Sequence, residues 1–236
     1  MTASARSKAA QAVECSAARA AFGSAGDGQN GGVVSGSGAG GVGEDRSGVR
    51  VRPFVPGDID AYRRWLQPDQ DWHRWDGPYF AKLDAGQIDA ACARLAAGLA
   101  DGSYAAHSPL QRAVIAAAED PTTILGTVSW HWESQASDWR RMGLTVYDPA
   151  LRGRGIGTAA LHIWTDYLFR TTDAVRLDYS TWSGNERMLA VGRRLGFTEE
   201  ARFRDAREVR GERYDSVVMG VLRREWEDRE REAATS

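Results

Sequence analysis

The pattern of apolar and polar positions divides the chain into short strands and amphipathic helices from residue 49 onward. Period-two alternation and short apolar runs predict strands at 49–54, 112–118, 122–132, 141–147 and 175–179, and a hairpin over 198–222. Apolar residues at helical spacing predict helices at 56–66, 85–99, 155–169 and 185–195. This order mixes an antiparallel meander with one βαβ crossover. It predicts an α+β fold, a mixed and mostly antiparallel sheet flanked by helices.

The first 48 residues differ in composition from the rest. Between Gly23 and Gly48 the chain is Gly, Ser and Ala with few large apolar groups. Burial there cannot offset the entropy of ordering the chain, roughly 1 to 2 kcal/mol per residue. We therefore predict a disordered tail over 1–48, one folded domain over 49–228 and a frayed C-terminus over 229–236. A true tail and a misassigned translation start both fit this composition. The closing segment 223–234 is a charged helix or a fraying end.

Charge and cysteine content narrow the classes of function. The formal net charge is −2 at pH 7, so we expect no nucleic-acid partner and no membrane binding. No apolar stretch reaches the roughly 20 residues of a membrane helix. Cys15 and Cys92 form neither a disulfide framework nor a metal-ligand spacing, and the four histidines are scattered. We therefore predict no metal and a cytoplasmic location. A homodimer stays an open alternative.

The crossover carries a glycine-rich loop, Leu151-Arg152-Gly153-Arg154-Gly155-Ile156-Gly157-Thr158. Its glycines let backbone amides approach an anion, the following helix N-terminus adds about half a positive charge, and two arginines add full charges. A diphosphate is a natural ligand. Gly155-x-Gly157-x-x-Ala160 with Asp178 also fits a dinucleotide fingerprint. That match is weak, because residues 148–154 separate the strand from the first glycine and no second βαβ unit follows.

Arg152-x-x-Gly155-x-Gly157 resembles the pyrophosphate loop of the GNAT (GCN5-related) N-acetyltransferases. Asn185-x-Arg187, followed by Arg194-Leu195-Gly196-Phe197, resembles the second half of the cofactor site in the RimJ/RimL-like branch, whose members acetylate protein N-termini and small amines. The resemblance implies the GNAT fold, a βαβ cofactor-binding crossover and acetyl-CoA as co-substrate. The residues it implies for cofactor binding are Leu144, Thr145, Val146, Arg152, Gly153, Arg154, Gly155, Ile156, Gly157, Thr158 and Asn185. Asn185 also suits a helix N-cap, and the two roles are compatible.

One position departs from this family pattern. Many relatives have a tyrosine four residues before the Gly-Phe pair, placed to protonate the leaving thiolate, and this chain has Gly192 there. The general acid therefore stays unassigned. The departure favours a second class of function, an acyl-CoA-binding sensor or interaction module without turnover. A nicotinamide or flavin oxidoreductase is a third class, which NADH binding would distinguish.

Acetyl transfer to an amine requires a neutral amine and a donor for the developing oxyanion. No Ser-His-Asp or Cys-His set stands out, which favours direct transfer without an acyl-enzyme. Strand alternation places His131 and Glu133 on one face, and we predict these two as catalytic residues. The other candidates for the general base are His73, Asp76 and Asp178.

Residues 71–80 combine four aromatic side chains with two acids. Aromatic faces and carboxylates together suit a cationic amine, so we predict that this segment binds the acceptor, a protein N-terminus or a small-molecule amine. The predicted acceptor-binding residues are Trp72, His73, Trp75, Asp76, Trp130 and Trp132. For Trp72 and Trp75 the alternative is that they only close the sheet edge.

Overall fold

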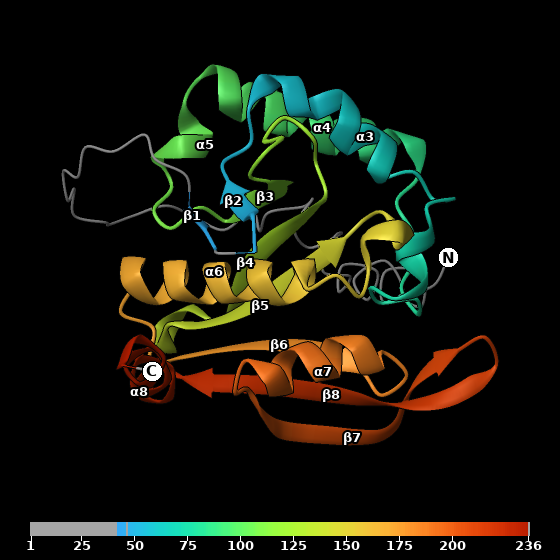
Figure 1. The fold of residues 1–236 in the computed structure, drawn as a ribbon. Helices are drawn as coiled ribbons and strands as arrows, with labels where there is room; N and C mark the ends of the chain where they lie inside the picture. The colour runs from blue at the N-terminus through green and yellow to red at the C-terminus, as the bar shows by residue number, and fades with distance from the viewer. Residues whose placement is uncertain (1–41, 46, 236) are drawn as a thin grey trace.

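The computed structural model describes residues 42–45 and 47–235 (Figure 1). In this part of the chain eight strands form one sheet, in the order β1-β2-β3-β4-β5-β6-β8-β7. The strands are β1 (Gly43–Glu44), β2 (Val49–Arg52), β3 (Arg112–Ala117), β4 (Gly126–Ser134), β5 (Trp139–Val146), β6 (Arg176–Trp182), β7 (Thr198–Val209) and β8 (Glu212–Leu222). The α-helices are α3 (Ile59–Trp65), α4 (Ala85–Ala100), α5 (Ser103–Ala106), α6 (Ile156–Thr171), α7 (Glu186–Arg194) and α8 (Arg223–Thr235). Short 3-10 helices lie at Pro56–Asp58, Asp71–Arg74, Gln135–Ser137 and Pro149–Leu151.

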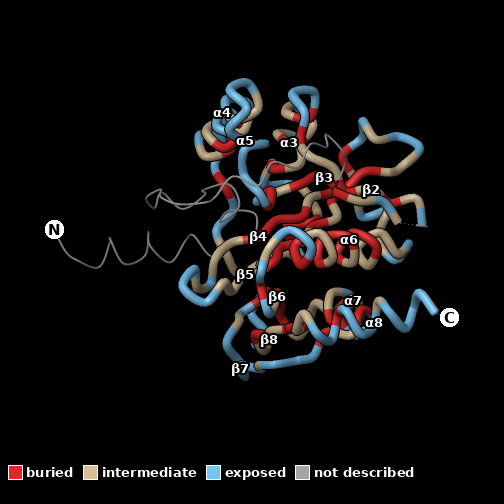
Figure 2. The backbone as a smooth tube through the Cα atoms, turned by 90° about the vertical axis from the view of Figure 1, so that its left-hand side faces the viewer, coloured by how far each residue is buried: buried red, intermediate tan, exposed pale blue. Residues whose placement is uncertain are grey.

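Helices cover both faces of the sheet and bury a cluster on each. Helices α6, α7 and α8 pack on one face, where Trp164 of α6 and Ile115 of β3 belong to the same buried cluster. Helices α3 and α4 pack on the other face, where Ile88 of α4 and Val114 of β3 belong to a second buried cluster. Neighbouring residues of β3 thus serve opposite faces, as strand alternation requires. Figure 2 shows the buried positions concentrated in the strands and in α6.

The parallel strands β5 and β6 pair only where they begin. Arg140 pairs with Leu177 and Arg141 with Asp178, and the register between the two strands ends there. Beyond that point β5 stays paired with β4, and β6 stays paired with β8. The two halves of the sheet therefore diverge after Arg141. Each strand then has one edge of backbone N–H and C=O groups without a partner strand in the described sheet, so a ligand can satisfy them.

The predicted α+β fold with a mixed, mostly antiparallel sheet is confirmed, and the differences are local. The strand predicted from residue 122 begins at Gly126, because the Asp120 carboxylate accepts hydrogen bonds from Thr122 and Thr123 and holds a turn there. Helix α5 was not predicted. None of the helices in the described ranges has the length and apolar character needed to cross a membrane.

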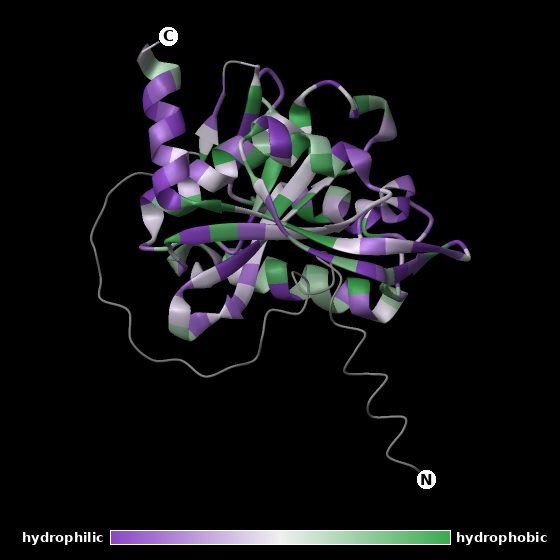
Figure 3. Cartoon of the chain, turned by 90° about the horizontal axis from the view of Figure 1, so that it is seen from below, coloured by the Kyte–Doolittle hydropathy of each residue, from purple (hydrophilic) through white to green (hydrophobic). Residues whose placement is uncertain are grey.

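Two predicted boundaries differ from the structure. Residues 1–41 and 46 of the predicted tail lie outside the described residues, whereas Gly43 and Glu44 form β1 and pair with β2. Order therefore begins before residue 49. At the other end, α8 continues through Thr235, where a frayed end from residue 229 was predicted. Trp226 anchors this helix in the core, and Figure 3 shows its remaining surface as largely hydrophilic.

Candidate active site

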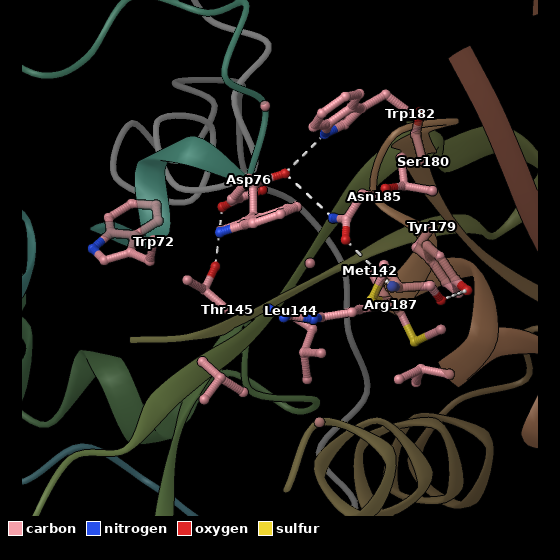
Figure 4. Close-up of a pocket in the computed structure, with 18 of the residues that line it drawn as sticks. Trp72, Asp76, Met142, Leu144, Thr145, Tyr179, Ser180, Trp182, Asn185 and Arg187 are labelled. Atoms are coloured by element: carbon pink, nitrogen blue, oxygen red, sulfur yellow. Dashed lines mark hydrogen bonds between the residues drawn. The ribbon is translucent and has the colours of Figure 1, made fainter. Parts of the chain in front are cut away.

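A cavity of about 500 Å³ opens where β5 and β6 diverge (Figure 4). This volume lies within the range of small-molecule sites, about 300 to 1,000 Å³. The cavity is bordered by β5, by β6 and α7, by the glycine loop and by side chains of residues 72–80. The segments that the sequence predicted for cofactor and acceptor therefore meet at one cavity.

Strand β5 presents alternate backbone groups to this cavity. The N–H of Tyr147 donates to the Leu125 carbonyl, on the β4 side, at 2.9 Å. Because backbone groups of successive strand residues point in opposite directions, those of Leu144 and Val146 face away from β4, toward the cavity. Both residues line it, as predicted for cofactor-binding residues. Thr145 reaches the cavity through its side chain instead.

The glycine loop lies at the N-terminus of α6. Gly153 and Gly155 have φ angles of 78° and 85°, in the left-handed region that favours glycine. The N–H groups of the first helical turn have no partner within the helix, and the helix dipole places partial positive charge there. Gly157 and Thr158 of this turn line the cavity. This end of the cavity therefore suits a diphosphate.

The two arginines of the loop have different surroundings. Arg152 is half-buried, lines the cavity and makes an ion pair with Asp71. This arginine holds the pKa of the Asp71 carboxyl below its ordinary value. In the described structure Arg154 is exposed and lies outside the cavity lining, and Ile156 packs against the buried cluster around α6. Of these three predicted cofactor residues, Arg152 is the one that the structure places at the cavity.

The second half of the cofactor motif is tied to residues 71–80 through one carbonyl. Asn185 accepts a hydrogen bond from the Met188 N–H at 3.3 Å and so caps α7. Asn185 Nδ2 donates to the Trp75 carbonyl at 3.3 Å, and Trp182 Nε1 donates to the same oxygen at 3.0 Å. The Arg187 guanidinium lies 5.2 Å from the centre of the Trp75 ring. Trp75 therefore links the predicted acceptor segment to the predicted cofactor motif, whose Asn185 and Arg187 are labelled in Figure 4.

Asp76 lies beside this link and lines the cavity. Its Oδ2 accepts a hydrogen bond from Thr145 Oγ1 at 3.0 Å (Figure 4). Burial raises the pKa of the Asp76 carboxyl to about 6, although the hydrogen bond from Thr145 acts in the opposite direction. The carboxyl group therefore changes protonation state close to neutral pH.

His131 and Glu133 also line the cavity, but they belong to a network of charges. His131 Nε2 and Arg141 Nη1 lie 3.3 Å and 3.0 Å from Glu133 Oε1. Arg141 Nε also donates to Asp178 Oδ1 at 2.7 Å, and Asp178 is fully buried. Glu133 and Asp178 therefore share Arg141 as a partner, and His131 joins this network through Glu133. Neither they nor any other group of side chains in residues 42–45 and 47–235 is arranged to hold a metal ion.

Trp130 and Trp132 point away from the cavity, which corrects their predicted role as acceptor-binding residues. Trp130 Nε1 donates to the Leu110 carbonyl at 2.8 Å in the buried layer next to α6. The Arg140 guanidinium lies 4.9 Å and 4.2 Å from the centres of the two tryptophan rings. Strand alternation is the reason, because it sends these two side chains to the face opposite His131.

His73 differs from its predicted role as an acceptor-binding residue, whereas Trp72 lines the main cavity. His73 borders a separate cavity of about 20 Å³, and its Nε2 lies 3.0 Å from the Gln67 carbonyl oxygen. Burial lowers its pKa. Trp72 is 1% exposed, donates from Nε1 to the Trp65 carbonyl at 2.6 Å and stacks on His73, with ring centres 3.7 Å apart. It touches the main cavity as part of the wall, which agrees with the alternative that it closes the sheet edge.

The space beside Gly192 of α7, where many relatives have a tyrosine, is filled by a tyrosine of strand β6. Tyr179 of β6 lines the cavity, and its hydroxyl group donates to the Met188 carbonyl at 2.9 Å. A Cβ atom at position 192 would overlap that hydroxyl oxygen. Gly192 is therefore required by packing against Tyr179. Sequence reasoning missed this tyrosine because nothing along the chain relates position 179 to position 192.

We expect Gly192→Ala to lower the free energy of unfolding by about 1 to 3 kcal/mol, because the added methyl group overlaps the Tyr179 hydroxyl. Tyr179→Phe should recover part of this loss in the double variant, although the ring carbon stays 3.1 Å from the new methyl group. Chemical denaturation of both single variants and the double variant measures the coupling. Simple additivity would contradict the packing explanation.

The divergent strands, the glycine loop at a helix N-terminus and the cavity between them make an α+β arrangement with a helix end suited to a diphosphate. A family model described as "Acetyltransferase (GNAT) domain" matches residues 49–198. The chain belongs to this GNAT acetyltransferase family, as its two sequence signatures predicted.

Known proteins are similar in sequence and in fold. The "Putative ribosomal N-acetyltransferase YdaF" of Bacillus subtilis (strain 168) is 33% identical over 105 residues, which are 44% of this chain and 57% of that protein. The chain thus matches little more than half the length of this relative. Mycobacterium smegmatis RimJ in complex with CoA-disulfide has a TM-score of 0.58 at 23% identity, over 76% of this chain and 84% of that chain. Ribosomal-protein-S5-alanine acetyltransferase from Vibrio fischeri has a TM-score of 0.60 at 18% identity, over 76% and 95%. The predicted fold is confirmed.

Proposed function

We propose that the chain transfers the acetyl group of acetyl-CoA directly to a primary amine, and that the acceptor is a protein N-terminus. The cavity at the divergence of β5 and β6 carries this proposal, because it joins a helix end suited to a diphosphate with an aromatic and acidic segment. The name of the Bacillus subtilis relative, a ribosomal N-acetyltransferase, supports a protein acceptor.

The residues of the cavity fit acetyl-CoA. Arg152 and the N–H groups at the start of α6 would hold the diphosphate, and the cavity-facing backbone groups of Leu144 and Val146 would bind the pantetheine arm. Asn185, at the start of α7, also lines the cavity. When bound, acetyl-CoA supplies an activated thioester. Backbone N–H groups of β5 that face the cavity are then available to hydrogen-bond the carbonyl oxygen as negative charge develops on it.

An acceptor ammonium group must lose a proton before it can attack. Among the carboxylates of the cavity, Asp76 is the best placed to take this proton. Glu133, predicted as a catalytic residue with His131, is already bound by Arg141 at 3.0 Å. The Asp76 carboxylate has one side-chain hydrogen bond among the described residues, from Thr145. A base with a pKa of about 6 is ionised at neutral pH and still accepts a proton from an amine.

The alternative of a sensor without turnover depended on Gly192. Because the Tyr179 hydroxyl group occupies the space next to this glycine, packing alone accounts for the residue. Gly192 therefore gives no separate indication that turnover was lost.

Thiol release from acetyl-CoA, measured with N-terminal peptides, polyamines and aminoglycosides, tests the proposed function. We expect release with peptides, and mass spectrometry should locate the acetyl group on the α-amine. Tight CoA binding without release across the panel would support the sensor instead. An acetylated form of the protein after mixing with acetyl-CoA alone would contradict direct transfer.

A further inference from the structure

Arg207 reaches the cavity from the long β7–β8 hairpin. The register between the two strands shifts between Glu199 and Ala201 and again between Phe203 and Arg207, where pairing resumes opposite Tyr214. Within this break Asp205 has a φ angle of 52°, and its N–H donates to the Asp215 carboxylate at 3.1 Å. Such an irregularity changes the direction of the strand and of the side chains that follow it. As a result the Arg207 side chain reaches the cavity, although β7 does not otherwise line it.

Two aromatic rings of residues 71–80 hold the Arg207 guanidinium. Its Cζ lies 4.5 Å from the centre of the Tyr79 ring and 5.6 Å from that of Phe80. Stacking on rings occupies the face of a guanidinium group and leaves its N–H edge for a hydrogen-bond acceptor. Arg207 Nε is buried without a hydrogen-bond partner in the described structure, and none of the described carboxylates forms an ion pair with this side chain. A buried donor of this kind is stabilised when a ligand accepts its hydrogen bond.

The charges that line the cavity favour an acceptor with a negative group. Asp76 can bind the reacting amine, and the Glu133 carboxylate is already paired with Arg141. Arg187 and Arg207 also line the cavity, and neither has an ion-pair partner among the described residues. A polyamine or an aminoglycoside would bring additional ammonium groups close to these arginines, which is unfavourable. A carboxylate near the amine would be attracted to them.

We propose that Arg207 forms an anion subsite in the acceptor site, which binds a carboxylate close to the reacting amine. The acceptor is then a peptide N-terminus followed by an acidic residue, with its α-amine at Asp76 and its acidic side chain at Arg207. This inference rests on the proposed function and specifies the substrate class for the same site.

The test compares three peptides that differ only at the second residue, which is Glu, Gln or Lys, together with spermidine. We expect the kcat/KM of the wild-type protein to be highest for the Glu peptide and lowest for the Lys peptide and spermidine. Arg207→Gln should lower the Glu-to-Gln ratio of kcat/KM by about tenfold, the size expected for loss of one charged hydrogen bond. Arg207→Glu should reverse the preference, so that the Lys peptide reacts faster than the Glu peptide.

Two further variants control for effects on folding and on overall charge. Arg204→Gln removes an exposed arginine from the same strand outside the cavity and should leave the peptide preference unchanged. Arg207→Lys keeps the charge and should keep the preference for the Glu peptide. A wild-type preference for Lys or spermidine, or an equal loss for all peptides in Arg207→Gln, would overturn the anion subsite while acetyl transfer itself stands. Absence of transfer by the wild-type protein to every acceptor would overturn the proposed function and the subsite together.

Discussion

Asp76→Asn is expected to lower kcat by about 100- to 10,000-fold while the affinity for acetyl-CoA stays unchanged. The asparagine amide can still accept the hydrogen bond from Thr145, so the local structure is kept, but it cannot take a proton from the acceptor. Steady-state kinetics with a peptide acceptor measures the first effect, and calorimetric titration with CoA measures the second. A variant with full kcat would remove Asp76 from the proton transfer.

The pH dependence of kcat separates Asp76 from the candidates on β4. The Asp76 carboxyl has a pKa of about 6, so activity should fall tenfold per pH unit below that value as the base becomes protonated. Thr145→Val removes the hydrogen bond that lowers this pKa, and the fall should then begin at higher pH. Glu133→Gln is the matched control, because it neutralises a cavity carboxylate that is already paired and should leave the profile in place. A profile moved by Glu133→Gln alone would assign the base to β4.

Asp76→Asn should not lower the free energy of unfolding at pH 8. The pKa of Asp76 in the folded protein, about 6, lies above its ordinary value of 3.8. The protonated carboxyl therefore favours folding at low pH, and this contribution is lost as the pH rises through 6. Because the ionised carboxylate opposes folding above that pH, Asp76→Asn should unfold at the same or a higher temperature at pH 8. Lower activity together with an unchanged or higher melting temperature would show that Asp76 serves catalysis and lowers the stability of the fold.

The parts of the fold that depend on local patterns could be predicted from the sequence. The glycine loop over 151–158 and the helix after it follow from left-handed glycines and apolar spacing within one segment. The divergence of β5 and β6 could not be predicted, because it depends on a pairing that ends after Arg141 and Asp178, residues far apart in the chain. The cavity exists because of that divergence. The sequence pattern of the glycine loop therefore predicted a diphosphate ligand, but it did not predict the cavity between β5 and β6.

The site residues show the same limit. Trp130 and Trp132 were assigned to the acceptor from their aromatic character, although strand alternation already placed them opposite His131. Tyr179 and Arg207 had no signal in the sequence. A glycine on a neighbouring helix makes room for the first, and an irregularity in the β7–β8 pairing directs the second. Both positions are set by contacts between distant segments, which residue spacing does not record.

Neutralising both loop arginines, with Arg152→Gln and Arg154→Gln, is expected to weaken acetyl-CoA binding by about 10- to 100-fold. A charged hydrogen bond contributes about 1.5 to 3 kcal/mol, and the structure places Arg152 at the cavity while Arg154 is exposed. Most of the loss should therefore appear in the Arg152→Gln single variant. Calorimetric titration with CoA measures the affinities, and Arg170→Gln, which removes an exposed arginine at the other end of α6, serves as the control.

Asp71→Asn should have the opposite effect and increase the affinity for CoA. The Asp71 carboxylate forms an ion pair with Arg152 and so competes with a diphosphate for the same guanidinium group. Its removal should therefore tighten CoA binding, most clearly at low ionic strength, where charges at a partly exposed site are least screened. The arginine variants and Asp71→Asn thus change the charge at the proposed diphosphate site in opposite directions. Unchanged affinity in the double arginine variant, together with unchanged affinity in Asp71→Asn, would place the diphosphate elsewhere than at the N-terminus of α6.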